Sequence, residues 1–394
     1  MSDLLDLLGT VPGDAVYDEM VDLRRSVHRH PELAFAEYDT TALVRDHMAA
    51  LGIEEARRVT ETGGIFVLNG GRPGRSVVLR GDIDALPVQE DVARSGHSEV
   101  EGVMHACGHD VHVAALLGAA SALASRREEL PGRYVFLFQP AEEALCGAKT
   151  MVENGALALM EGACLIGFHV TSVLQTGFLA LREGVTMSEA HSLTITLTGP
   201  GGHGAVPNEG DVLRAAAELV GRLHSVVEGL RYEGTHCVCS AGTLTAGTAV
   251  NVVPTSAKVT GTLRTFTDAQ RVSAVTLLRE LCGSVADERG VTIDLELPEH
   301  TPAVVNDAAV TATVEAEASV VLGSDAVFRM PPAAPSDDVS EFLAHLPGCY
   351  FFVGGAAPDG SCGMHHCPTF SVEDGSLRVG ASVMVRSAVA LATR

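Results

Sequence analysis

A cysteine and two histidines stand close together in residues 104–110, where the sequence reads MHACGHD. Cys107 and His109 are two residues apart, so a thiolate and an imidazole can face one cation of the zinc group. The same triplet also arises by chance, as a buried cysteine beside an exposed histidine. Spacing alone therefore leaves a metal site and an accidental pair both open.

Two adjacent glutamates, Glu142 and Glu143, follow the apolar run 134–138. Neighbouring side chains in an extended loop point in different directions, so one carboxylate can bind a metal while the other faces a substrate. Repulsion between the two carboxylates is costly without a cation. Two solvated surface glutamates are the ordinary alternative, but a position directly after a strand of core character favours a site.

Three further histidines complete the set of candidate ligands. His169 closes the apolar run 164–168, where a buried core histidine is the alternative interpretation. His365 and His366 precede a turn fixed by Pro368, where exposed loop residues are the alternative. A thiolate, three imidazoles and a carboxylate suffice for two cations about 3.5 Å apart with a position left for water.

Two aspartates near these residues are candidates to orient the ligand imidazoles. Asp84 follows the apolar run 76–80, and Asp110 follows His109 directly. Metal-binding histidines commonly donate their other ring N–H to a carboxylate, which fixes the tautomer. We therefore expect Asp84 and Asp110 to support the ligands rather than to bind metal.

The segments that position these motifs alternate between helices and strands. Apolar strands separated by helices predict a mostly parallel α/β sheet, in which chemistry collects at the carboxyl ends of the strands. The predicted helices are 16–51, with a break at His30-Pro31, and 113–125; the predicted strands are 65–68, 76–80 and 134–138.

The pattern changes between about Leu193 and Leu297 and then resumes as α/β near Ala303. The predicted order there is strand, helix, strand, strand, helix, strand, which is the ferredoxin-like βαββαβ unit. Its expected elements are 191–197, 211–227, 237–245, 257–266, 268–288 and 291–297. We therefore predict an inserted domain.

The composition excludes several classes of partner. The chain has 27 Lys+Arg against 50 Asp+Glu, a formal net charge of -23, which repels nucleic acid and anionic membranes. We expect no nucleic-acid partner, no membrane partner and no signal peptide. Nine scattered cysteines are typical of thiols in a reducing compartment, so a cytoplasmic location is expected.

These motifs, in this order, resemble the aminoacylase, hippurate hydrolase and auxin-conjugate hydrolase group of co-catalytic metallopeptidases. The matching segments are 27–33, 80–87, 105–110, 139–143, 167–170, 201–203, 251–254 and 261–266. The resemblance implies a mostly parallel α/β catalytic domain, formed by residues 1–185 and 299–394. It also implies that the βαββαβ insertion, 186–298, is a lid and dimerisation domain.

Carried over residue by residue, the resemblance places the catalytic carboxylate on Glu142. It selects His366 over His365 because the family pattern is His, one residue, Pro. It further implies that Cys107 bridges two divalent ions per subunit, with zinc, manganese, cobalt and nickel as candidates. The five implied metal ligands are Cys107, His109, Glu143, His169 and His366.

The inserted domain supplies the other implied site residues. His203 matches a histidine that reaches the scissile carbonyl, commonly in the site of the partner subunit, so a homodimer is expected. Asn251 and Arg264 match the positions that hold the amino-acid end of the substrate. A surface arginine paired with solvent is the alternative for Arg264.

The chain departs from the family pattern at a few positions. An acidic residue is common where His191 stands, and a histidine is often found where Asn208 stands. The usual Glu-Asp pair appears as Asp337-Asp338, and Cys367 replaces a small or polar residue. These departures concern the substrate pocket and leave the implied metal ligands in place.

The expected reaction is hydrolysis of the amide bond of a small N-acyl amino acid. Two metal ions lower the pKa of a water molecule, and Glu142 takes its proton and returns it to the leaving amine. His203 stabilises the oxyanion, and Arg264 holds the free carboxylate. The alternatives are a dipeptidase or aminopeptidase, a pathway-specific deacylase, and a binding protein that has lost catalysis.

Overall fold

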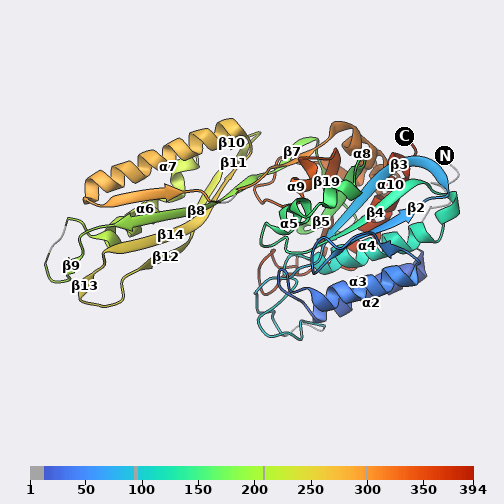
Figure 1. The fold of residues 1–394 in the computed structure, drawn as a ribbon, viewed down its shortest axis with the longest axis horizontal. Coiled ribbons are helices and arrows are strands. Elements are labelled where there is room, and N and C mark those ends of the chain that lie inside the picture. Colours follow the sequence, from blue (N-terminus) through green and yellow to red (C-terminus); the bar gives the residue numbers. More distant parts are fainter. Residues whose placement is uncertain (1–12, 93–95, 207–208, 299) are drawn as a thin grey trace. The chain divides into compact units, whose positions relative to one another are not determined.

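The structure is a computed structural model that describes residues 13–394, apart from 93–95, 207–208 and 299. The chain divides into two compact units, and Figure 1 labels the elements of each. The first unit contains the residues up to Gly184 together with Val305–Met330 and Asp338–Arg394. The second contains Val185–Val304 and Pro331–Asp337. Residues 331–337, assigned by sequence to the catalytic domain, therefore cluster with the second unit.

The first unit is built on an eight-stranded sheet, and the predicted α/β class with a mostly parallel sheet is confirmed. Its four central strands are parallel neighbours, and antiparallel pairs flank them. In sheet order the strands are β1 (Glu54–Glu55), β2 (Gly64–Asn69), β4 (Pro131–Gln139), β3 (Arg72–Asp82), β5 (Cys164–Gln175), β19 (Gly348–Ala356), β6 (Leu179–Leu181) and β18 (Val327–Arg329).

Helices pack on this sheet around one large apolar core. Helix α4 (His109–Ala124) is buried on nearly all sides, as its run of small and apolar residues requires. It begins four residues before the predicted start, so His109 lies in its first turn. The other helices are α2 (Asp14–Arg29), α3 (Tyr38–Ala50), α5 (Gly147–Glu153), α8 (Ala308–Leu322), α9 (Ser340–Leu343) and α10 (Gly375–Ala392).

Gly108 shows why the turn before α4 requires glycine. Its φ of 89° lies in the left-handed region that side chains disfavour. A Cβ at this position would also lie 2.4 Å from Cγ1 of Val170 on β5. The turn can therefore bring Cys107 and His109 against the sheet only because residue 108 has no side chain.

Strand register sets the position of His169 at the catalytic edge. Arg80 of β3 pairs with Gly167 of β5, so His169 lies level with Asp82, the last residue of β3. The sequence predicted that His169 closes its strand, whereas β5 continues to Gln175. The difference arises because β19 extends further than β3 and keeps pairing with β5 beyond His169.

The second unit is an antiparallel sheet with its own apolar core. The strand order β12-β14-β8-β15 is that of a βαββαβ unit. Its main elements are β8 (Glu189–Thr198), α6 (Val212–Leu223), β12 (Val238–Ala246), β14 (Ser256–Thr265), α7 (Asp268–Arg289) and β15 (Thr292–Glu296). Asp211 caps α6 by accepting hydrogen bonds from two backbone amides, and Thr267 caps α7 in the same way with one.

Several short strands complete the fold. One of them, β16 (His300–Thr301), pairs with β8 alongside β15. The others form three two-stranded ladders, namely β7 (Gly184–Met187) with β17 (Val304–Asn306), β9 (Gly202–His203) with β13 (Val252–Val253), and β10 (Arg231–Tyr232) with β11 (Thr235–His236). Among the described residues, no helix is long and apolar enough to cross a membrane.

Candidate metal centre

Two histidines at the carboxyl edge of the sheet are anchored through their Nδ1 atoms. Nδ1 of His109 lies 2.9 Å from the carbonyl oxygen of Asp84, and Nδ1 of His169 lies 2.6 Å from that of Val170. A carbonyl oxygen only accepts, so each Nδ1 carries the hydrogen. The Nε2 lone pair of each neutral ring is then available to a metal ion.

The five predicted ligands form two groups of three that share Cys107. One group is Cys107, His109 and His169, and the other is Cys107, Glu143 and His366. Within each group the possible ligand atoms all lie within 4.8 Å of one another. Sγ of Cys107 lies 3.4 Å from Nε2 of His169. A thiolate common to both groups has the position that a bridging ligand requires.

The carboxylate of Asp84 fixes the loop that carries the two glutamates. Its Oδ1 accepts a hydrogen bond from the backbone N–H of Glu142, and its Oδ2 accepts one from that of Glu143, each at 3.0 Å. An oxygen of each glutamate lies 3.9 Å from Nε2 of His109. Asp84 therefore contacts both parts of the candidate site. Its carbonyl oxygen and its Oδ1, the latter at 3.3 Å, lie against Nδ1 of His109, and its carboxylate holds the backbone of the two glutamates.

The electrostatics of these side chains favour a bound cation. Burial raises the pKa of Cys107 well above its usual value, and the nearby Glu143 and Glu142 raise it further. Burial likewise raises the pKa of Glu143 to about 7. Nε2 of His109 and Oε1 of Glu143 are buried without a hydrogen-bond partner. Divalent cations of the zinc group fit this donor set, since they would pair the orphaned atoms and offset the repulsion.

The structure distinguishes the two adjacent histidines near the C-terminus. Nε2 of His365 accepts a hydrogen bond from the backbone N–H of Ser172 at 3.3 Å, which leaves the proton on Nδ1, 3.7 Å from Sγ of Cys107. His366 has a φ of 62° and brings Nε2 to 3.5 Å from Oε2 of Glu143. This arrangement favours His366 as the ligand and His365 as a donor to the thiolate.

Asp110 has a different environment from the one predicted. Its Oδ2 lies 3.0 Å from Nε of Arg24 and 3.0 Å from Nδ1 of His28. Neither partner belongs to the candidate ligands. Asp110 therefore ties α4 to α2 next to His109, and the ring of His109 is oriented by Asp84.

Sequence reasoning missed a buried network behind the ligands. Asp82 accepts a hydrogen bond from Nδ1 of His112 and lies 3.8 Å from Nδ1 of His109. The N–H of Val170 donates to Nε2 of His112 at 2.9 Å, which places the proton of a neutral His112 on Nδ1. Burial alone would raise the pKa of Asp82, but Arg80 and the two histidines hold it well below its usual range. The signal was the spacing of His109 and His112 on one helix face.

Asp338 belongs to the same buried network. Its Oδ1 accepts a hydrogen bond from Nε2 of Gln139 at 2.5 Å, and its Oδ2 accepts one from the backbone N–H of Ala148 at 2.9 Å. Gln139 is the last residue of β4 and precedes the loop of the two glutamates. Asp338 therefore helps to hold that loop, a role that the Asp337-Asp338 pair did not reveal in the sequence.

The predicted substrate residues lie in the second unit, at two places along its sheet. His203 on β9 pairs with Val252 on β13, and the carbonyl of Asn251 accepts a hydrogen bond from Gly204 at 2.9 Å. These two residues are therefore neighbours. Arg264 lies near the end of β14, where its Nη1 donates to Oγ of Ser336 at 2.7 Å. Asn208, where the sequence departs from the family pattern, lies outside the described residues.

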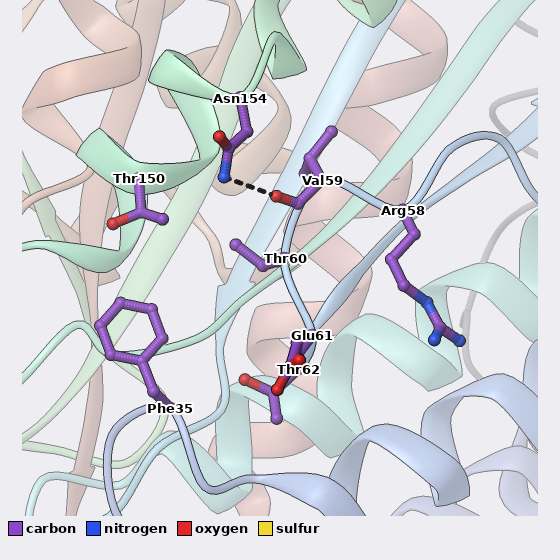
Figure 2. Close-up of a pocket in the computed structure, with 8 residues that line it drawn as sticks. All are labelled: Phe35, Arg58, Val59, Thr60, Glu61, Thr62, Thr150 and Asn154. Atoms are coloured by element: carbon purple, nitrogen blue, oxygen red, sulfur yellow. Dashed lines mark hydrogen bonds between the residues drawn. The ribbon is translucent and has the colours of Figure 1, made fainter.

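A cavity of about 420 Å³ opens on the first unit among Phe35, Arg58 and Thr150, and Figure 2 shows its lining side chains. Nδ2 of Asn154 donates to the carbonyl of Val59 at 2.9 Å within this lining. None of the lining residues is a candidate ligand or a predicted substrate residue. The cavity therefore plays no part in the assignment of the site.

Comparison with known families identifies the chain. Residues 78–390 match peptidase family M20/M25/M40. The chain belongs to this family. As an M20-family chain, it is a metal-dependent amidohydrolase or peptidase. The predicted resemblance to aminoacylases and auxin-conjugate hydrolases is thereby confirmed at the level of the family.

Relatives of this M20-family chain match along nearly their whole length. Thermostable carboxypeptidase 1 of Saccharolobus solfataricus is 32% identical, with 96% of this chain and 97% of the relative covered. IAA-amino acid hydrolase ILR1-like 2 of Arabidopsis thaliana is 34% identical, with 97% and 87% covered. The Bacillus subtilis YXEP protein, described as a dinuclear metal-binding peptidase, has 29% identity and a TM-score of 0.80, with 96% and 99% covered.

Replacing Cys107 by alanine should weaken the binding of both metal ions, because its sulfur belongs to both ligand groups. Loss of a residue that only hydrogen-bonds to a metal ligand lowers metal affinity about ten- to a hundredfold. Loss of the shared thiolate itself should therefore lower it at least about a hundredfold. Elemental analysis after dialysis against a chelator measures this effect, and activity should disappear with the metal. Cys164→Ala is the matched control and should retain its metal. Metal content in Cys107→Ala equal to that of the unmodified protein would contradict the shared position.

Proposed function

We propose that this chain hydrolyses the amide bond of N-acyl amino acids with two divalent ions in its first unit. The observation that carries this proposal is the pair of ligand groups that share Cys107, with Glu142 beside them. The names of two relatives support this type of reaction, since one is an IAA-amino acid hydrolase and the other is described as a dinuclear metal-binding peptidase. The ligand assignment is Cys107, His109, Glu143, His169 and His366.

Glu142 is the residue proposed to move protons in this reaction. When bound, the two cations lower the pKa of a water molecule and polarise the amide carbonyl. Glu142 is buried, with 5% of its surface exposed, and the backbone contact with Asp84 fixes it next to the ligands. Its carboxylate accepts a proton from water and returns it to the nitrogen of the leaving amine.

His203 has the correct tautomer to stabilise an oxyanion. The backbone N–H of Ala205 donates to its Nδ1 at 3.1 Å, so the neutral ring carries its proton on Nε2. The residue is exposed, and its Nε2–H can donate to a group outside its own loop. Asn251, held next to His203 by the ladder of β9 and β13, is proposed to contact the substrate from the same side.

A homodimer formed through the second unit is part of the proposal. Strand β12 lies at the edge of its sheet, and residues 242–245 of this strand are exposed. An exposed edge strand can extend the sheet by pairing with a copy of itself.

Arg264 is proposed to hold the free α-carboxylate of the substrate. A hydrogen bond to a charged group contributes about 1.5–3 kcal/mol, so Arg264→Gln should lower kcat/KM for N-acyl amino acids by about ten- to a hundredfold. The same variant should cleave the corresponding C-terminal amides as well as the unmodified protein does. Arg279→Gln, which alters an exposed arginine of the same unit, is the control. Equal losses on acids and amides would exclude carboxylate recognition by Arg264.

The second candidate function is cleavage of dipeptides or C-terminal residues, and the carboxypeptidase relative favours it. Both functions use the same metal ions and the same carboxylate recognition. They differ in whether the acyl side carries a free amine. A screen of N-acyl amino acids against dipeptides, with manganese, zinc, cobalt or nickel, separates them. Higher kcat/KM on dipeptides across the panel would overturn the proposed preference.

A further inference from the structure

A second group of metal-binding side chains lies in the second unit, within its own sheet. Glu189 and His191 are two residues apart on β8, so their side chains point to the same face. His300 on β16 pairs directly with His191, and Thr265 on β14 pairs directly with Glu189. Cross-strand partners also share a face, so the register alone gathers these four side chains.

The carboxylate of Glu189 is held in a defined orientation. Its Oε1 accepts a hydrogen bond from the hydroxyl of Thr265, and its Oε2 lies 3.1 Å from Nε2 of His300 and 3.7 Å from Nε2 of His191. One oxygen is thus anchored while the other faces both imidazoles. Metal-binding carboxylates are commonly fixed in this way.

His191 supplies an independent indication of a missing partner. Only 7% of its surface is exposed, and its Nε2 is buried without a hydrogen-bond partner. A nitrogen buried in this way costs free energy unless something binds it.

The spacing of the three ligand atoms suits a small divalent ion. Ligands about 2.0–2.1 Å from a tetrahedral zinc ion lie about 3.3 Å from one another. The two distances from Oε2 of Glu189 bracket this value, and all three ligand atoms lie within 4.8 Å of one another. The rings of His191 and His300 are stacked, with centroids 4.4 Å apart, so the half-exposed His300 must turn to aim its Nε2 at the ion.

One cation already lies near this carboxylate. Nε of Arg271 on α7 is 3.7 Å from Oε1 of Glu189. The guanidinium lies on the Thr265 side of the carboxylate and also pairs with Asp268 at 2.5 Å. It therefore lies nearest to Oε1, whereas the two imidazoles lie against Oε2.

We propose that Glu189, His191 and His300 bind one divalent ion of the zinc group, with water completing its coordination. This ion is separate from the two ions of the catalytic centre, and the inference does not depend on the substrate of that centre. Glu189 and His191 lie on the segment by which the chain enters the second unit, and His300 on the segment by which it leaves. The ion would tie these two segments together.

Metal counting on the full-length chain tests the proposal. After equilibrium dialysis against buffered zinc, the unmodified protein should hold one more zinc ion than His300→Ala. The control is His236→Ala, which removes another histidine of the second unit and should lose none. In a Cys107→Ala background, one ion should remain, and Glu189→Gln should remove it.

Cobalt substitution identifies the ligands of the additional ion. The absorption spectrum of the cobalt-loaded Cys107→Ala protein should show visible d–d bands. It should lack a thiolate-to-cobalt charge-transfer band, because Glu189, His191 and His300 supply no sulfur. Equal zinc content in the unmodified protein and His300→Ala would overturn the proposal. So would an equal loss in His236→Ala, since that result indicates unspecific binding to surface histidines.

Discussion

Glu142→Gln should lower turnover at least about a hundredfold while leaving the metal content unchanged, because glutamine keeps the shape of the side chain but cannot accept a proton. The backbone N–H of Glu142 holds the loop against Asp84, and this contact survives the substitution. The residual rate would report what the metal ions and the substrate-binding residues achieve without a base. Single-turnover kinetics with elemental analysis measure both quantities on the same sample.

Substitution of the neighbouring residue, Glu143, should have a different effect from Glu142→Gln. Glu143 lies in a ligand group with Cys107 and His366, so Glu143→Ala should lose metal and activity together. Added metal should restore part of the activity of Glu143→Ala and none of that of Glu142→Gln. If the two variants showed the opposite behaviour, the roles of base and ligand would have to be exchanged.

Mixing inactive His203→Ala chains with inactive Glu142→Gln chains should restore activity to about a quarter of that of the unmodified protein. Random pairing makes half of the dimers hybrid, and each hybrid regains one complete site if His203 serves the partner subunit. Activity should rise from near zero on the time scale of subunit exchange, which native mass spectrometry can follow.

The geometry of the second unit supports the proposal that His203 acts in the active site of the partner subunit. His203 lies where β9 pairs with β13, close to the start of β14 at Ser256, whereas Arg264 lies near the other end of that strand. At about 3.3 Å per residue, eight residues separate these ends by about 26 Å. One chain cannot bring both side chains to one small substrate, whatever the position of its two units.

A matched control makes the mixing experiment decisive. In the control, a chain carrying both substitutions is mixed with His203→Ala chains. Neither chain of the resulting hybrids has His203, so activity should stay near zero. Absence of rescue in the first mixture, despite proven exchange, would exclude the arrangement in trans.

Much of the site could be predicted because it depends on local sequence. Runs of apolar residues located β2, β3, β4 and the first part of β5, although not β19, and motifs near those runs nominated Glu142, Glu143 and Cys107. The features that sequence missed depend on register between distant segments. Asp82 meets His112 only because α4 packs over the end of β3, and Asp110 turns to Arg24 because α2 lies beside α4. The proximity of His191 and His300 likewise follows from strand pairing across more than one hundred residues.

The position of β19 has a consequence for how the chain is made. This strand lies inside the first unit's sheet, between β5 and β6, but it is synthesised after all of the second unit. As the polypeptide leaves the ribosome, the second unit can therefore fold while β5 still exposes an unpaired edge. An open edge of this kind attracts other strands, so we expect aggregation to be a hazard for the nascent protein until Gly348–Ala356 emerges and completes the sheet.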